Sequence, residues 1–366
     1  MKKTLALLLA LTLLVALVVG CTPKTTDPTP TPNTTPAETN DENVGKTLTI
    51  YSWEGMFPDE IIDGFRTETG INIKYVVFDT DETMYAKLEA AGGGDYDLIF
   101  ADDYIIELAI ETGLVQKLDK SKLTQYANIN PVYQGQFYDP ADEYTVPYGA
   151  GVQTIVYDPA AVGHEITGYA DLLDPSLKDN IGIIANYRVI NGLALKINGH
   201  SYNTEDTYEL DAAGEKLLEL APNIRVIKDD NLQDDLISGE IDVAVMYTSQ
   251  VTMALLERPD LEVVYPVEGI GFGVMAGFIP SNAPNATAAH MFLDYILDPA
   301  RGASCFEWLG YYSTYSASDE FISDEFKPFL TLPEDFGDTE MIGNVNDATL
   351  QKHERIWTAF RDASGK

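Results

Sequence analysis

Short apolar runs alternate with amphipathic stretches after residue 46 of the chain. The β-branched run KTLTIYSW precedes PDEIIDGFRTETG, in which Ile61, Ile62 and Phe65 share one face of a helix that ends near Gly70. The same order recurs in INIKYVVF followed by DETMYAKLEAAGGG, and in YDLIFA followed by DYIIELAIETG. Strands that alternate with helices in this way predict a largely parallel sheet with helices on its faces.

This pattern restarts after residue 159, with predicted strands in NIGIIA, IRVIK and DVAVMY and predicted helices in NGLALKIN, DAAGEKLLELA and LQDDLISG. A pair of strands in LEVVYPVEGIGFGVMAGFIP follows, and then helices around AAHMFLDYILD and RGASCFEWLG. We therefore predict two α/β lobes joined by a hinge, with crossings at residues 145–154 and 269–277. The predicted lobes comprise residues 46–152 with 273–320, and residues 153–272 with 321–366.

The beginning of the chain has the features of an export signal. Residues 1–20, MKKTLALLLALTLLVALVVG, have two lysines, an apolar core and a small residue before Cys21, and VVGC fits the lipobox of bacterial lipoproteins. A retained membrane-spanning helix is the alternative, because about 18 apolar residues suffice to cross a bilayer. Residues 21–45 are rich in Thr and Pro and predict a flexible tether. We expect lipidation of Cys21 to hold the protein at the outer face of the cytoplasmic membrane.

The chain is strongly acidic, with a formal net charge of −35. Nucleic acid and anionic membrane surfaces are therefore poor partners, whereas small cations are attracted, although solvation of the surface explains acidity equally well. Once Cys21 is acylated, Cys305 has no second cysteine to pair with, and we interpret it as a small buried apolar residue.

Aromatic and acidic residues follow several of the predicted strands. Ligands of open α/β sheets bind outside the carboxyl ends of the strands, so these exits predict one shared cleft. An aromatic face beside a carboxylate suits an ammonium group, although each aromatic could instead belong to the core. The residues at these exits are Trp53, Glu54, Gly55 and Met56, then Asp102, Asp103 and Tyr104, and finally Tyr247.

Motifs of catalysis and metal binding are missing from the sequence. The four histidines have no partner at metal-ligand spacing, and no phosphate-binding loop or catalytic serine motif occurs. The match of residues 271–276 to a dinucleotide fingerprint precedes a predicted strand rather than a helix, which argues against such a site. We expect a protein without metal, cofactor or catalysis, and an enzyme remains the less favoured alternative.

Several long stretches resemble one known family. They are LTIYSWEGMFPDEIIDGFRTETGINI, DETMYAKLEAAGGGDYDLIFADDYIIELAIETGLVQKLDKSKL, VPYGAGVQTIVYDP and LGYYSTYSA. In these stretches the chain is similar to the extracytoplasmic spermidine/putrescine-binding proteins of ABC importers. The resemblance implies a type II periplasmic-binding fold, two lobes that close on a solute, delivery to a membrane permease, and no catalysis.

The resemblance also implies which residues bind the ligand. The tryptophan after the first strand is kept as Trp53, and the Ser-x-Tyr after the third strand is replaced by residues 102–104. The family's Asp-x-x-Glu falls on Asn186 and Val189, its late Trp-x-Asp on Gly273 and Met275, and a C-terminal polar residue near Asn344. The predicted ligand site is Trp53, Glu54, Asp102, Asp103, Tyr104, Asn186 and Tyr247.

The sequence thus predicts a monomeric, lipid-anchored subunit of an ABC importer that binds a polyamine. Most of the acids that hold amines in the family are replaced, and the remaining carboxylates lie at one end of the predicted cleft. A different amine, a quaternary ammonium compound or another small solute therefore stays open as the ligand. A surface receptor that does not transport is a further alternative.

Overall fold

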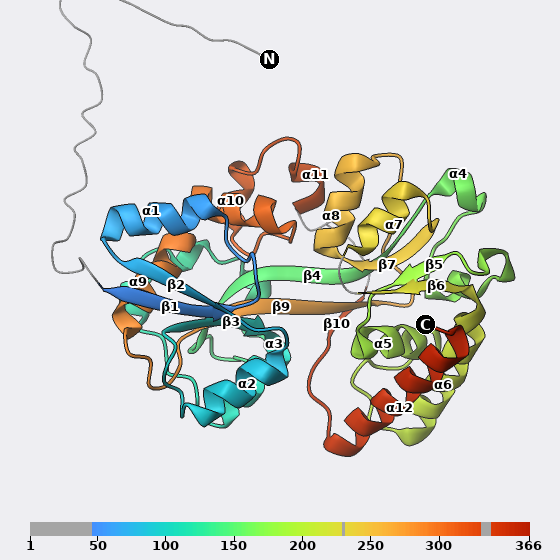
Figure 1. The fold of residues 1–366 in the computed structure, drawn as a ribbon, viewed down its shortest axis with the longest axis horizontal. Helices are drawn as coiled ribbons and strands as arrows, with labels where there is room; N and C mark the ends of the chain where they lie inside the picture. Colours follow the sequence, from blue (N-terminus) through green and yellow to red (C-terminus); the bar gives the residue numbers. More distant parts are fainter. Residues whose placement is uncertain (1–45, 229–230, 331–337) are drawn as a thin grey trace, which may run out of the picture. The chain divides into compact units, whose positions relative to one another are not determined.

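The computed structural model describes residues 46–228, 231–330 and 338–366 (Figure 1). Its strands form one mixed sheet in the order β2-β1-β3-β9-β4-β7-β5-β6, with β10 paired to β9 and β8 paired to β4. The strands are β1 (Thr47–Ser52), β2 (Asn72–Val77), β3 (Leu98–Asp102), β4 (Thr145–Tyr157), β5 (Ile181–Ile183), β6 (Ile224–Ile227), β7 (Val243–Tyr247), β8 (Glu262–Val264), β9 (Ile270–Phe278) and β10 (Thr339–Met341).

Two parallel groups of strands are joined by antiparallel ones. Strand β1 runs parallel to β2 and β3, and β5 runs parallel to β6 and β7, as the alternating pattern predicted. Strand β9 is antiparallel to β3 and β4, and β4 is antiparallel to β7. We name the part built on β1, β2 and β3 lobe 1, and the part built on β5, β6 and β7 lobe 2. The long strands β4 and β9 run from one lobe toward the other (Figure 1).

Helices cover both faces of the sheet in each lobe. In lobe 1, α1, α9 and α10 lie on one face and α2 and α3 on the other, whereas in lobe 2 α7 and α8 lie opposite α5, α6 and α12 (Figure 1). The helices are α1 (Asp59–Thr69), α2 (Asp81–Ala90), α3 (Asp103–Glu111), α4 (Pro159–Val162), α5 (Tyr187–Ile197), α6 (Thr207–Leu220), α7 (Leu232–Ser238), α8 (Thr248–Glu257), α9 (Ala286–Ile296), α10 (Pro299–Leu309), α11 (Lys327–Leu330) and α12 (Asp347–Ser364).

Local sequence explains where these helices begin and end. Helix α1 ends at Gly70, whose φ of 71° is a left-handed conformation that glycine adopts without steric cost. Helix α10 begins after Asp298, whose carboxylate accepts the backbone N–H groups of Ala300 and Arg301, both at 3.2 Å. The sequence analysis predicted both of these helices, but it did not identify α8 or α12.

Each lobe has its own hydrophobic core. The core of lobe 2 includes Ile183 and Val245 of the sheet and receives Ile356 and Phe360 from α12. In lobe 1 the core on the α1 side contains Cys305, which is fully buried, as the sequence analysis predicted. Burial raises the pKa of the Cys305 thiol to about 12, so the thiol is uncharged at neutral pH.

Candidate functional site

One face of the sheet connects the two lobes through a row of neighbouring side-chain positions. Residues paired across adjacent strands point to the same face, as do residues two apart along one strand. The row begins at Asp102 of β3 and ends at Tyr247 of β7. Between them it passes through Met275, Gly149, Gly273, Gly151 and Gln153. Two of the predicted site residues therefore share this face, which we name the cleft face, and glycines form its middle.

Tyr311 covers part of this glycine surface. A Cβ atom at Gly151 would lie 3.0 Å from Cε1 of the Tyr311 ring, so the ring can approach the backbone because glycine is present. Burial raises the pKa of Tyr311 to about 12, and the charge of Asp102 adds to this shift. The sequence analysis missed Tyr311 as a site residue, although it occurs in LGYYSTYSA, one of the stretches that carried the resemblance.

Carboxylates gather at the lobe 1 end of the cleft face. The hydroxyl of Tyr104 donates to Oδ2 of Asp81 at 3.3 Å and to Oε1 of Glu82 at 3.2 Å. The backbone N–H of Asp102 donates to Oδ1 of Asp81 at 3.4 Å. Asp81 begins α2, the element that follows β2. The rule that ligands bind at strand exits therefore indicates Asp81, but the sequence analysis did not apply this rule to β2.

Both aspartates of this group hold a proton more tightly than usual. Burial raises the pKa of Asp102 to about 6, and the charge of Glu82 contributes, whereas a hydrogen bond with Asp81 opposes the shift. Burial raises the pKa of Asp81 well above its ordinary value, and the neighbouring Asp102 charge raises it further. Placing two carboxylates together in a partly dehydrated site disfavours ionisation of both.

Asp103 has a different environment, although it is adjacent in sequence. Its carboxylate accepts the N–H of Tyr104 at 2.7 Å and the N–H of Val274 in β9 at 2.9 Å. Burial raises the pKa of Asp103 and these two hydrogen bonds oppose the shift. Asp103 therefore connects the start of α3 to β9 and supports the cleft face by holding the backbone of β9.

These acids lack a protein cation as partner. Within residues 46–228, 231–330 and 338–366, the ion pairs include none of Asp81, Glu82, Asp102 and Asp103. A buried carboxylate without a compensating charge is unfavourable unless it is protonated or a cation binds it. The group is therefore arranged to receive positive charge from outside the chain.

Trp53 and Glu54 lie at the exit of β1, the strand that pairs with β3. The indole of Trp53 packs against Phe78 with ring centroids 4.9 Å apart, and its carbonyl accepts the hydroxyl of Tyr75 at 2.6 Å. Glu54 is exposed and is followed by Gly55, whose φ of 74° turns the chain toward α1. Trp53 is thus held by its neighbours, whereas Glu54 faces solvent.

The lobe 2 side of the cleft face is neutral. Oδ1 of Asn186 accepts the backbone N–H groups of Arg188 and Val189 at 3.0 and 3.2 Å, which caps α5. The amide nitrogen of Asn186 donates to the hydroxyl of Tyr247 at 3.0 Å, so the structure brings these two predicted site residues together. Val189, where the resemblance implied a second acid, is buried in the core of lobe 2.

The C-terminal segment joins the two sides of the site. The Arg188 guanidinium donates to the carbonyls of Tyr202 and Gly343 at 3.3 and 3.1 Å, and burial lowers its pKa. The next residue, Asn344, donates to the carbonyl of Tyr104 at 2.9 Å. Asn344 therefore bridges from the segment held by lobe 2 to the beginning of α3 in lobe 1.

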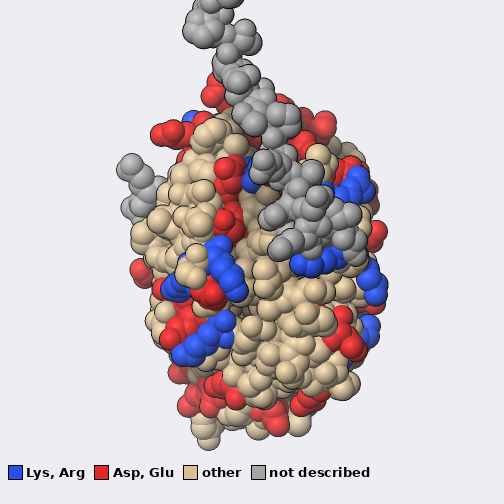
Figure 2. All heavy atoms as spheres, turned by 90° about the vertical axis from the view of Figure 1, so that its left-hand side faces the viewer, with Lys and Arg blue, Asp and Glu red and all other residues tan. Residues whose placement is uncertain are grey.

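The described residues contain neither a metal-binding cluster nor a membrane-spanning helix. In the part of the chain that the structure describes, no group of three or more His, Cys, Asp or Glu could hold a metal ion. Across the same residues, every helix is too short or too polar to cross a membrane. On the lobe 1 side shown in Figure 2, the Lys and Arg side chains are interspersed with Asp and Glu.

Comparisons with known proteins identify the family of the chain. The family model described as bacterial extracellular solute-binding protein matches residues 60–329. The spermidine/putrescine-binding periplasmic protein of Salmonella typhimurium is 33% identical over 280 residues, which cover 76% of this chain and 80% of that protein. Its Escherichia coli counterpart is 32% identical over 309 residues, which cover 84% of this chain and 87% of that protein.

A solved structure has a similar fold. The spermidine/putrescine ABC transporter substrate-binding protein of Streptococcus pneumoniae superimposes on this chain with a TM-score of 0.79 at 27% sequence identity. The match covers 87% of this chain and 100% of that protein. The two-lobe periplasmic-binding fold predicted from the sequence is therefore confirmed.

Proposed function

The chain belongs to the family of bacterial extracellular solute-binding proteins, whose role is binding without catalysis, and we propose from this premise that its solute is a polyamine. Relatives at 32–33% identity are named spermidine/putrescine-binding proteins. In this proposal the protein binds the polyamine between its lobes and delivers it to the permease of an ABC importer. The alternative of a receptor that does not transport has no comparable support.

The carboxylates of lobe 1 carry the proposal. Asp81 is buried and Asp102 is partly buried, and the backbone N–H of Asp102 donates to the Asp81 carboxylate. Among the described residues, neither carboxylate forms an ion pair with Lys or Arg. An ammonium group would supply the missing positive charge and allow both acids to ionise. A neutral or anionic solute would leave the charge of this group uncompensated.

Aromatic rings complete the proposed site. Trp53, Tyr104 and Tyr247 come from three different strand exits, and Tyr311 covers the glycines between them. Each ring face that meets an ammonium group contributes about 0.5 kcal/mol in water and about 2 kcal/mol when water is excluded. The residues that we propose for the site are Trp53, Glu54, Asp102, Tyr104, Asn186 and Tyr247, to which we add Asp81, Glu82 and Tyr311. Asp103, also predicted as a site residue, would support them through its hydrogen bond to β9.

Closure of the lobes is the proposed means of capture. Strands β4 and β9 and the segment around Asn344 connect the lobes, so bending at these segments would change the separation of the two sides of the cleft face. The predicted boundaries assign residues 46–152 with 273–320 to lobe 1 and residues 153–272 with 321–366 to lobe 2. We retain them in this proposal with one change, which moves residues 321–330 to lobe 1 because Ile322 and Leu330 are buried in its core.

The location and oligomeric state are also proposed. Residues 1–20 as a signal peptide, Cys21 as the lipidated residue and residues 21–45 as a tether lie outside the described residues. The family assignment is that of an extracellular protein, in keeping with an anchor at the outer face of the cytoplasmic membrane. We propose that the protein acts there as a monomer beside its permease.

A binding experiment tests the proposed solute. The chain from Cys21 onward, with Cys21→Ser to prevent acylation, would be titrated with spermidine, putrescine, choline, betaine and a neutral sugar by calorimetry. A polyamine should bind and raise the melting temperature by mass action. Binding of another of these solutes, with no heat from spermidine or putrescine at millimolar concentration, would reject polyamine as the solute.

A further inference from the structure

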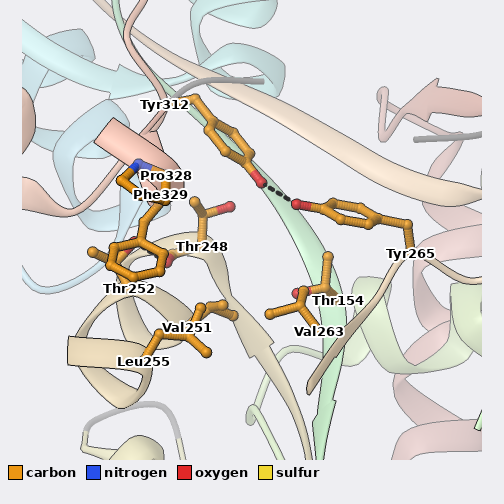
Figure 3. A pocket seen from close by; sticks show the side chains of 10 residues that line it. All are labelled: Thr154, Thr248, Val251, Thr252, Leu255, Val263, Tyr265, Tyr312, Pro328 and Phe329. Carbon is orange, nitrogen blue, oxygen red and sulfur yellow. Dashed lines mark hydrogen bonds between the residues drawn. The ribbon is translucent and has the colours of Figure 1, made fainter. Parts of the chain in front are cut away.

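A cavity of about 220 Å³ lies on the opposite face of β4 from the cleft face. Side chains alternate between the two faces of a strand, so Thr154 points away from the side on which Gly151 and Gln153 lie. Thr154 lines this cavity (Figure 3). We name it the rear cavity, because it lies behind the strand that forms the floor of the cleft.

Both lobes contribute to the rear cavity. Lobe 2 supplies one side, with Thr154 of β4, Val263 of β8, and Thr248, Val251, Thr252 and Leu255 of α8. The other side is formed by Tyr312 and Phe329, and the backbone of this region is held toward lobe 1. The N–H of Tyr312 donates to the carbonyl of Ala150 at 3.1 Å, and Leu330, which follows Phe329, is buried in the lobe 1 core.

A pair of tyrosines closes one edge of the rear cavity. The hydroxyls of Tyr265 and Tyr312 lie 2.9 Å apart, and both rings line the space (Figure 3). Tyr311 and Tyr312 are neighbours in sequence, yet Tyr311 covers the glycines of the cleft face while Tyr312 faces the rear cavity. One short segment therefore contacts both sides of β4.

The lining selects an uncharged occupant with one polar group. No Asp, Glu, Lys or Arg is among the described residues that line the cavity. Of its three threonines, Thr248 donates to the carbonyl of Val152 and Thr252 to that of Gly310, at 3.2 and 3.0 Å. The hydroxyl of Thr154 is buried, with the residue 2% exposed, and has no hydrogen-bond partner among the described residues. A buried hydroxyl without a partner is unfavourable, and a ligand hydroxyl would satisfy it.

The size of the cavity limits the occupant to a small molecule. An engineered apolar cavity of roughly 150 Å³ holds one benzene molecule. The rear cavity is larger, at about 220 Å³, and is lined by Val, Leu, Tyr and Phe side chains. One aromatic ring with a hydroxyl substituent satisfies both the volume and the Thr154 hydroxyl.

We propose that the rear cavity binds a small uncharged aromatic alcohol and that its occupancy favours closure of the lobes. The rear cavity and the cleft lie on opposite faces of β4. If the lobes bend toward each other on the cleft side of β4, they therefore move apart on the side of the rear cavity. A molecule that occupies the rear cavity holds α8 away from Tyr312 and Phe329, and this opposes reopening. This coupling rests on the proposed function, whereas binding to the cavity does not.

Binding is tested first, without a polyamine. Phenol and benzene would be titrated into the chain from Cys21 onward, carrying Cys21→Ser, and followed by calorimetry and ligand-detected NMR. Phenol should bind, and Thr154→Val should lower its affinity about fivefold while that for benzene stays within twofold, since Val removes only the hydroxyl. Absence of phenol binding at millimolar concentration, or an unchanged phenol affinity in Thr154→Val, would overturn the site. A crystal soaked with phenol that shows water alone in the cavity would do the same.

Coupling is tested second, by titrating spermidine with and without phenol. Saturating phenol should raise spermidine affinity about fivefold, and spermidine should raise phenol affinity by the same factor, because linkage is reciprocal. Val263→Phe, which fills the cavity, should abolish phenol binding and itself raise spermidine affinity, and Leu255→Phe provides a second filling variant if the first unfolds. Phenol binding that leaves spermidine affinity unchanged overturns the coupling. If phenol binds and no polyamine does, the proposed function fails while the rear cavity remains a binding site.

Discussion

The two sides of the cleft face differ in charge. The lobe 1 side contains Asp81 and Asp102, together with Glu82, whereas the lobe 2 side contains the neutral pair Asn186 and Tyr247. The family resemblance implied acids on the lobe 2 side, at the positions of Asn186 and Val189. The fold is thus shared with a relative, while the carboxylates of this chain lie on the side of the cleft face opposite to the positions that the resemblance implied.

This difference suggests an order of binding events. Under the proposed function, lobe 1 would attract and hold an ammonium group by charge before the lobes close. Lobe 2 would then contribute an amide and an aromatic ring, which add contact area and exclude water. A scaffold can keep its closing motion while its ligand-holding charges are relocated, because the fold depends on the cores and the ligand on the few residues at the strand exits.

Removal of the lobe 1 charge should have the largest effect. Asp81→Asn combined with Asp102→Asn should lower polyamine affinity about a hundredfold, because each hydrogen bond to a charged group contributes about 1.5 to 3 kcal/mol. Calorimetry measures the loss. Glu89→Gln, an exposed change on the same helix α2, is the matched control and should leave the affinity within twofold. Equal affinities for the double variant and the control would contradict the assignment of charge to lobe 1.

The affinity should also depend on pH, through the same residues. Since the pKa of Asp102 is raised to about 6, its carboxylate is mostly protonated at pH 5 and ionised at pH 7.5. A cation prefers the ionised form, so affinity should rise about tenfold over this interval. The stability of the ligand-free protein should instead fall as pH rises. A carboxyl whose pKa is raised on folding contributes stability that is fully present below its pKa in the unfolded state, and this contribution is lost as pH rises through 6.

Titrations at several pH values, with melting curves of the ligand-free protein, check both trends. Asp102→Asn should flatten each of them. A slope that persists unchanged in Asp102→Asn would assign the pH dependence to another group.

Restoring an acid to lobe 2 should increase affinity by a smaller factor. Asn186→Asp keeps a side chain that caps α5 and adds a carboxylate beside the hydroxyl of Tyr247. We expect polyamine affinity to rise about fivefold, because one partly solvated charge pair adds about 1 kcal/mol. Asn186→Ala, which removes the cap and adds no charge, should destabilise the protein by about 1 kcal/mol and give no gain. An unchanged affinity in Asn186→Asp would show that the ligand does not reach this side.

The smallest effect is expected at the middle of the cleft face. Gly151→Ala places a Cβ atom 3.0 Å from Cε1 of Tyr311, so the ring has to shift toward the ligand space. Polyamine affinity should fall threefold to fivefold, roughly the loss of one ring contact. Gly214→Ala in α6, whose Cβ would meet Ile356 at an ordinary 3.4 Å, is the control for a glycine replaced elsewhere. An unchanged affinity in Gly151→Ala would remove Tyr311 from the site.

Much of the fold followed from local patterns in the sequence. The strand and helix units from β1 to α3 were predicted because apolar side chains recur with periods of two or 3.6 residues. Helix α12 was not identified, although Ile356 and Phe360 pack into the lobe 2 core. Its polar composition gives a weak signal by itself, and its position depends on the surface that it covers.

The candidate site was predicted in part for the same reason. Trp53, Asp102 and Tyr247 were predicted because residues after parallel strands meet at one edge of a sheet, and of these Asp102 and Tyr247 lie on the cleft face. The sequence could not show that Asp103 supports β9, whereas its neighbour Asp102 faces Asp81, because this depends on which way each side chain turns. It also could not show that the ring of Tyr311 packs on glycines more than 150 positions earlier in the chain.

The sequence by itself therefore determined the two-lobe α/β fold, the family and the strand exits that we propose as the ligand site. These features depend on short-range periodicity and on motifs that are continuous in the chain. The tertiary structure alone decided that Asp81 and Glu82 join Asp102 and Tyr104, that Tyr311 covers the glycines of the cleft face, and that a rear cavity lies behind β4. Such features arise where side chains distant in sequence are brought within a few ångströms, and their burial and pKa values are properties of that packing.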